Sequence, residues 1–247
     1  MPELLVLWDV DYTLVNANGL GTQLYRDVFL ELYGRELTTV APKAGRTDRA
    51  IALDTLALAG IAEPRAHVDA FLAGLARHVA ALRRSPPAQV LALPGASDAL
   101  AALASARLHQ SALTGNIRIL AELKLRAAGL DAYLDFDAGA YGDVHEVRAE
   151  LVDVARRAAK GVYGRDFSGE ATVLVGDTPL DVEAALATGA RVVGVATGSY
   201  PAVALAEAGA HVVLADLTDT DRGLAAITSR TARSGTARND AARTDRP

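Results

Sequence analysis

Five short apolar runs recur along the chain, and they constrain its fold more than any other feature. Each run is rich in valine, leucine or alanine, and most end in Asp, Gly or Thr: 3–9, 109–115, 171–177, 191–197 and 211–216. Continuous runs of this length are typical of strands that are buried on both faces of a parallel sheet.

Helical patterns lie between most of these runs, at 94–106, 117–129, 147–161 and 179–189. Strands that alternate with helices form right-handed βαβ units. The sequence therefore predicts an α/β fold with a doubly wound, Rossmann-like parallel sheet. In such folds ligands bind at the carboxyl ends of the strands.

The alternation stops after the first run. Three helix-like stretches follow at 18–34, 47–60 and 64–83, without a strand run as strong as the others, before "RRSPPAQ" (83–89) leads back to the sheet. We therefore expect two domains: a Rossmann-like core of residues 1–14 and 88–227, and an inserted α-helical domain of residues 15–87. An insertion at this point would cover the carboxyl ends of the strands.

Composition excludes several classes of protein. The net charge of −5 over 247 residues argues against bulk binding of nucleic acid, and the absence of cysteine excludes disulfides and thiolate metal sites. Residues 228–247 carry five arginines and no large apolar residue, so we expect a disordered tail. Without a signal peptide or a run of about 18 apolar residues, we expect a cytoplasmic protein with no membrane partner.

Polar residues gather where three of the expected strands end. The first end carries Asp9 and Asp11, whose charges repel unless a cation, a proton or solvent compensates them. The other two ends carry Thr114, Gly115 and Asn116, and Asp177 and Asp181.

Some of these residues also have purely structural interpretations. Asn116 is a candidate N-cap for the helix that starts near Ile117. Thr178 and Asp181 have the spacing of a capping box around Pro179. Asp9 and Asp11 are not placed to cap a helix, which favours a functional role for both.

Three motifs occur in a fixed order: "DVDYTL" (9–14), "LTGN" (113–116) and "GDTPLDVEAA" (176–185). Together they resemble the haloacid dehalogenase-like hydrolase superfamily, in particular its Mg²⁺-dependent phosphatases. The resemblance covers roughly residues 4–227. The segment "AGRTDRAI" (44–51) is similar to the cap loop of phosphoglycolate phosphatase-like members.

The resemblance implies a role for each polar strand end. Asp9 would be the nucleophile and Asp11 the general acid and then the general base. Thr114 and the amide of Gly115 would hold the phosphoryl oxygens, with Asn116 also binding substrate.

The implied cofactor is Mg²⁺. Its ligands would be Asp9, the main-chain carbonyl of Asp11 and Asp177, with a water-mediated or orienting contact from Asp181.

The family also places a basic residue between the second and third motifs, where it balances the nucleophile and the phosphate. We favour Arg148, which opens the helix before the third motif, over Lys124. Lys124 lies in mid-helix, where we expect a solvated side chain.

The inserted domain, residues 15–87, resembles the cap of the family's enzymes. In it Arg46 and Thr47 are candidate substrate-binding residues, with Lys43 and Arg49 nearby. An equally good interpretation is that Thr47 is the N-cap of the helix that follows it.

The favoured hypothesis is Mg²⁺-dependent hydrolysis of a phosphate monoester, a small phosphorylated metabolite, through an aspartyl-phosphate. A β-phosphoglucomutase-like sugar phosphomutase and a non-catalytic binding protein with the same fold are the alternatives. The sequence identifies neither the substrate nor the oligomeric state.

Overall fold

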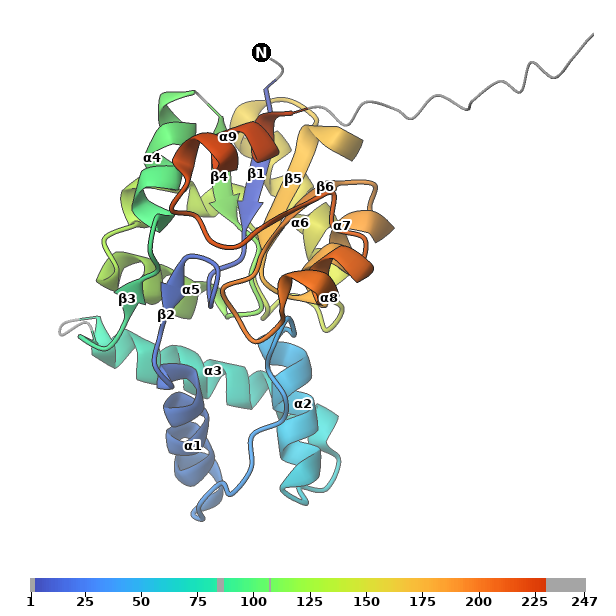
Figure 1. Ribbon diagram of the computed structural model, residues 1–247. Coiled ribbons are helices and arrows are strands. Elements are labelled where there is room, and N and C mark those ends of the chain that lie inside the picture. The colour runs from blue at the N-terminus through green and yellow to red at the C-terminus, as the bar shows by residue number, and fades with distance from the viewer. Residues whose placement is uncertain (1–2, 84–86, 107, 230–247) are drawn as a thin grey trace, which may run out of the picture.

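The computed structural model describes residues 3–83, 87–106 and 108–229. At its centre is a five-stranded sheet in the order β4-β1-β5-β6-β7, in which every neighbouring pair is parallel (Figure 1). The strands are β1 (Leu5–Trp8), β4 (His109–Ala112), β5 (Thr172–Gly176), β6 (Arg191–Val195) and β7 (Val212–Leu214). Each lies within one of the five apolar runs.

Helices cover both faces of this sheet. Successive side chains of a strand point to opposite faces, so Val6 and Trp8 enter one hydrophobic cluster while Leu5 and Leu7 enter another. The first cluster includes side chains of α4 (Ala96–Ser105), α5 (Arg118–Ala127) and α9 (Thr220–Thr228). The second includes α6 (Arg148–Tyr163), α7 (Pro179–Ala187) and α8 (Ala202–Glu207). The predicted doubly wound α/β fold is confirmed.

Three further helices lie beyond the end of the sheet toward which the arrows of β1 and β4 point (Figure 1). They are α1 (Leu20–Tyr33), α2 (Asp48–Leu58) and α3 (Pro64–Leu82), and we call them the helical unit. Tyr25 of α1 packs on Phe71 of α3 with ring centroids 5.1 Å apart. The expected helices of this region are present, and the division of the chain into core and cap domains stays a prediction.

A small second sheet joins the two segments that connect the helical unit to the main sheet. In it β2 (Val15–Asn16) pairs antiparallel with β3 (Leu91–Ala92). The backbone N–H of Leu93 also donates to the carbonyl of Leu14 over 2.8 Å. Two-residue strands carry no periodic signal, which is why the sequence did not indicate this sheet.

Short 3₁₀ helices at Asp131–Tyr133, Phe136–Ala138 and Gly169–Ala171 complete the secondary structure of the described chain. Among the described residues no helix is both long enough and apolar enough to cross a membrane. The predicted disordered tail, apart from its first two residues, lies outside the described residues.

Candidate active site

Three neighbouring strands direct polar residues to one place. β1 lies between β4 and β5, so the residues that follow these strands, Asp9, Thr114 and Asp177, meet at a common edge of the sheet. They line a cavity of about 340 Å³ that is closed on its other side by residues of the helical unit and its connecting segments. The convergence predicted from the sequence is therefore present.

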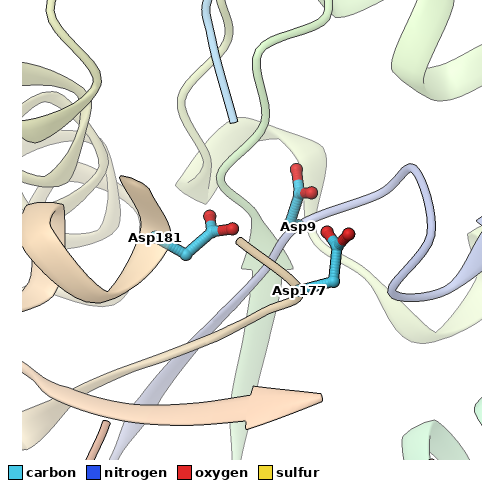
Figure 2. A group of neighbouring side chains, drawn as sticks. All are labelled: Asp9, Asp177 and Asp181. Atoms are coloured by element: carbon cyan, nitrogen blue, oxygen red, sulfur yellow. The ribbon is translucent and has the colours of Figure 1, made fainter. Parts of the chain in front are cut away.

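Asp9, Asp177 and Asp181 form a buried acidic cluster. Each offers one carboxylate oxygen, and these oxygens all lie within 4.8 Å of one another (Figure 2). Two glycines pack directly against the cluster. A Cβ on Gly198 would lie 1.8 Å from Asp177 Oδ2, and one on Gly176 would lie 2.3 Å from Asp181 Cγ. Larger residues at these two positions would displace the carboxylates.

Arg148, the first residue of α6, provides a cation for this cluster. Its Nη2 lies 2.9 Å from Asp9 Oδ1 and 2.6 Å from Asp181 Oδ1. The guanidinium also donates to the carbonyls of Gly45 and Leu113, over 3.4 and 3.3 Å. The structure thus brings the favoured basic residue of the sequence analysis to the side chain that it was expected to balance.

One guanidinium does not balance three carboxylates. Burial, with Asp181 and Asp11 nearby, raises the pKa of Asp9 to about 6 although Arg148 opposes the shift. Burial, with Asp9 and Asp181 nearby, raises the pKa of Asp177 to about 9. The hydrogen bond that Thr13 donates to Asp177 is long, at 3.5 Å. A set of oxygen ligands with excess negative charge suits a hard divalent cation, so these residues could hold a metal ion.

Asp11 lies in different surroundings. Both of its carboxylate oxygens accept hydrogen bonds from Lys124 Nζ, over 2.8 and 2.6 Å. Asn116 Nδ2 donates to Asp11 Oδ2 over 2.7 Å and to Thr114 Oγ1 over 2.9 Å. Burial acts to raise the pKa of Asp11, but Lys124 and Asn116 outweigh it and lower the pKa below its usual value.

The expectation of a solvated Lys124 is wrong, because the side chain is only 3% exposed. α5 buries the stripe that contains Leu120 and Lys124, one turn apart, and this stripe faces the cavity.

Asn116 is not the N-cap of α5. Its side chain is engaged by Asp11 and Lys124, and the free backbone N–H of Ile117 donates instead to Asp48 Oδ2 over 2.8 Å.

The capping interpretation of Asp181 is confirmed, and its expected contact to a metal stays a prediction. Its Oδ2 accepts hydrogen bonds from the backbone and the hydroxyl of Thr178, over 3.1 and 2.7 Å, which completes the expected capping box of α7. Its other oxygen, Oδ1, contacts Arg148. The capping box therefore fixes the carboxylate that helps to hold the arginine.

Thr47 is the N-cap of α2, as in the structural interpretation. Its hydroxyl accepts from the backbone of Ala50 over 3.2 Å and donates to the carbonyl of Glu146 over 3.1 Å. Arg46 Nη2 lies 2.5 Å from Asp54, on the outer side of the same turn. The Arg46 residue lines the cavity, whereas Thr47 does not.

Gly115 packs directly against the turn that contains Arg46 and Thr47. A Cβ at Gly115 would lie 1.9 Å from the carbonyl oxygen of Arg46, so only glycine allows the two segments to approach this closely. The carbonyl of Gly115 accepts a hydrogen bond from the backbone of Asp48 over 2.6 Å. The helical unit is thus attached to the loop that contains Thr114.

Sequence reasoning missed Asp48, which is 5% exposed and lines the cavity. Tyr25 donates to its Oδ1 over 2.9 Å, and the burial of the carboxylate raises its pKa. Two basic residues lie near Arg46 and Thr47 in the sequence. Lys43 lines the cavity and contacts the hydroxyl of Thr22, whereas Arg49 pairs with a surface aspartate. The sequence signal that could have indicated Asp48 is its position in "GRTD" (45–48), directly after the candidate substrate-binding residues Arg46 and Thr47.

Solved structures share this fold at low sequence identity. A hydrolase from Pseudomonas syringae is 23% identical, with a TM-score of 0.62 over 92% of this chain and 100% of its own. A protein from Clostridium acetobutylicum described as a predicted phosphatase is 16% identical, with a TM-score of 0.63 over 91% and 99%. A protein from Thermotoga maritima, provisionally described as a beta-phosphoglucomutase, is 20% identical, with a TM-score of 0.55 over 90% and 98%.

No curated protein matches the sequence. The family model of haloacid dehalogenase-like hydrolases matches residues 6–186, a span that contains all three motifs and both basic residues. The chain belongs to the haloacid dehalogenase-like hydrolase family.

Proposed function

We propose that this protein is a Mg²⁺-dependent phosphatase that hydrolyses a small phosphate monoester through an aspartyl-phosphate on Asp9. The observation that carries the proposal is the position of Asp9, whose Oδ1 contacts Arg148 at 2.9 Å at the floor of the cavity while Asp11 lies on the cavity wall. A nucleophile and an acid/base group that face one cavity are what a two-step phosphoryl transfer requires.

In the first step an Asp9 carboxylate oxygen attacks phosphorus, and the bond from phosphorus to the ester oxygen breaks. The electron pair stays on the leaving oxygen, which takes a proton from the carboxyl group of Asp11. Asp11 would take up this proton as the phosphate dianion enters the cavity, because a nearby negative charge raises the pKa of a carboxyl group. In the second step a water attacks phosphorus and gives a proton to the Asp11 carboxylate. Asp9 is regenerated, and the products are an alcohol and inorganic phosphate.

Charge is the main obstacle to this chemistry, because a phosphate dianion must approach Asp9. Arg148 would offset part of that charge, and Thr114 and the amide of Gly115, which line the cavity, would bind phosphoryl oxygens. Asp9, Asp177 and Asp181 would hold Mg²⁺, with the main-chain carbonyl of Asp11 as a further ligand. When bound, Mg²⁺ would neutralise the carboxylates and the phosphoryl oxygens.

The size of the cavity supports a small substrate. About 340 Å³ accommodates a metabolite and excludes a polymer, and the helical unit covers the opening. We propose that this unit acts as the cap of the enzyme.

The test is phosphate release from p-nitrophenyl phosphate and a panel of phosphorylated metabolites, with Mg²⁺ or EDTA. We expect Mg²⁺-dependent turnover by the wild type and a loss of about 10⁴-fold or more in Asp9→Asn. The matched control is Asp153→Asn, because Asp153 is an exposed aspartate of α6 and should keep full activity. The absence of phosphate release from every substrate by folded, Mg²⁺-loaded wild type would exclude the phosphatase.

A phosphomutase is the second candidate, because two structures of the same fold are provisionally named after beta-phosphoglucomutase. The same nucleophile would then return the phosphoryl group to a sugar instead of to water. Conversion of a sugar phosphate into its isomer without release of inorganic phosphate would favour this candidate.

A further inference from the structure

A lysine in the interior of α5 makes a fully occupied set of hydrogen bonds. Lys124 Nζ donates to Asp11 Oδ1 over 2.8 Å, to Asp11 Oδ2 over 2.6 Å and to Asn116 Oδ1 over 2.7 Å. An ammonium group has three N–H donors, and these three acceptors use all of them. The lysine is therefore held in one orientation against the carboxylate of Asp11.

Stability does not account for this arrangement. A buried ion pair contributes little more than an apolar pair of similar volume, because both charges lose their hydration. Lys124 is 3% exposed, whereas the Asp11 side chain remains 32% exposed and lines the cavity. The lysine thus supports a more exposed carboxyl group that lines the same cavity.

The two oxygens of Asp11 are not equivalent. Oδ2 accepts from both Lys124 and Asn116, whereas Oδ1 accepts from Lys124 alone among the described side chains. A carboxylate oxygen has two acceptor sites, so Oδ1 keeps one site available. Oδ1 is therefore the atom placed to carry the transferred proton.

We propose that Lys124 is a positioning residue which, with Asn116, fixes the carboxyl group of Asp11 so that Oδ1 faces the leaving group. Arg148 serves Asp9 and Lys124 serves Asp11, so the two basic candidates of the sequence divide between the two acids. This inference rests on the proposed phosphatase function. It assigns Lys124 to bond breaking at the ester oxygen and not to binding of the phosphate.

The role predicts a particular dependence on the leaving group. A 4-nitrophenolate departs with little help from an acid, whereas unsubstituted phenolate needs a proton. If Lys124 positions Asp11, its loss should matter more as the leaving group becomes poorer. A residue that only supports the fold, or only binds phosphate, would affect every ester alike.

The experiment measures kcat/KM with Mg²⁺ for phenyl phosphates that carry 4-nitro, 4-cyano and 4-chloro groups, and for phenyl phosphate itself. For Lys124→Met we expect a loss of about threefold with 4-nitrophenyl phosphate and about 100-fold with phenyl phosphate, because general acid catalysis contributes at least about 10²-fold. Lys124→Arg, which keeps the charge, should recover part of the difference. Lys160→Met, a change at a 59% exposed lysine of α6, is the control and should match the wild type.

A double-variant cycle tests whether Lys124 acts through Asp11. Asp11→Asn should show the same steep dependence, and Asp11→Asn/Lys124→Met should show little further loss. An equal loss for all four esters, or losses that multiply in the double variant, would overturn the positioning role. If Lys124→Met does not fold by circular dichroism, Lys124→Gln replaces it under the same criterion. If the folded wild type hydrolyses neither these four esters nor any member of the metabolite panel, the phosphatase function fails and this role fails with it.

Discussion

Asp9 and Asp11 are separated by one residue in the chain, but their carboxyl groups lie in different electrostatic surroundings. Asp9 shares one arginine with Asp181 and lies among buried carboxylates, so its pKa is raised. Asp11 forms an ion pair with Lys124 and accepts a further hydrogen bond from Asn116, and together they outweigh the effect of burial and lower its pKa. The metal-free protein therefore has excess negative charge on one side of the cavity and a balanced ion pair on the other.

The difference follows from the elements that surround each residue. Asp9 directly follows β1, and β5 is the neighbouring strand. Asp9 therefore lies close to Asp177, which follows β5, and to Asp181 of α7. Asp11 lies two residues further along the chain, where its carboxylate contacts Lys124 of α5. Two neighbouring acids thus acquire separate environments because a loop directs them toward different helices, which is a common way to divide roles between like groups.

The largest effect is expected from Arg148→Met. This change leaves Asp9 and Asp181 buried without their cation, which should lower the free energy of unfolding in EDTA by about 3 kcal/mol or more and kcat/KM by about 10³-fold. Lys124→Met should be less destabilising, because Asp11 faces the cavity and water can replace part of the lost contact. Urea unfolding in EDTA checks both variants.

Arg148→Lys is the matched control, since it keeps the charge but loses the guanidinium, whose Nη2 contacts both carboxylates and which also donates to the carbonyls of Gly45 and Leu113. Its stability should lie between those of the wild type and Arg148→Met. A Lys124→Met variant that is less stable than Arg148→Met would contradict the difference between the two sides of the cavity.

The next effect is a pH dependence that arises from buried aspartates with raised pKa values, which are Asp9 and Asp177 on the acidic side and Asp48 across the cavity. The raised pKa values of Asp9, about 6, and Asp177, about 9, mean that the folded state binds more protons than the unfolded state above pH 4. Stability in EDTA should therefore be greatest near pH 4 and fall as pH rises toward 9, by up to about 1.4 kcal/mol per pH unit for each retained proton. Urea unfolding at intervals between pH 5 and 9 measures the slope.

Asp177→Asn separates this effect from others with the same pH dependence. Asparagine is neutral without binding a proton, so the variant should be about 2 kcal/mol more stable than the wild type in EDTA at pH 8, with a shallower slope. Mg²⁺ should stabilise the wild type and leave the variant nearly unchanged. A variant that is less stable than the wild type in EDTA would show that Asp177 is not a source of repulsion.

The sequence predicts the acidic side of the cavity better than the other side. Strand runs that end in Asp9 and Asp177 place both residues at one edge of a parallel sheet, and Arg148 opens the helix that leads to β5. The two aspartates follow from a local pattern together with a topological rule, and Arg148 follows from the resemblance to the family, so neither a contact nor a distance is needed in advance.

The environment of Asp11, on the other side of the cavity, is formed by contacts between elements that are distant in sequence. Lys124 reaches Asp11 across 113 residues, and Asp48 caps α5 across 69 residues. The one local signal was a lysine on the apolar stripe of an amphipathic helix, four residues after Leu120. A cation in such a stripe has to meet an anion inside the protein, but the pattern does not say which one.

The smallest effect is expected at Thr47, which lies close to both sides of the cavity but belongs to neither. Its hydroxyl caps α2 and contacts the carbonyl of Glu146, and the residue does not line the cavity. Thr47→Ala should therefore lower the free energy of unfolding by about 1 kcal/mol, the usual value of an N-cap. Urea unfolding at constant pH measures this loss.

The same variant tests whether Thr47 binds substrate, as the sequence allowed. We expect kcat/KM to stay within about twofold of the wild type, because the mutation is at a helix terminus outside the cavity. Thr47→Ser keeps the capping hydroxyl and should restore most of the stability. A tenfold rise in KM for Thr47→Ala, with Thr47→Ser unaffected, would instead place the hydroxyl in the substrate site and would show that the loop before α2 moves when substrate binds.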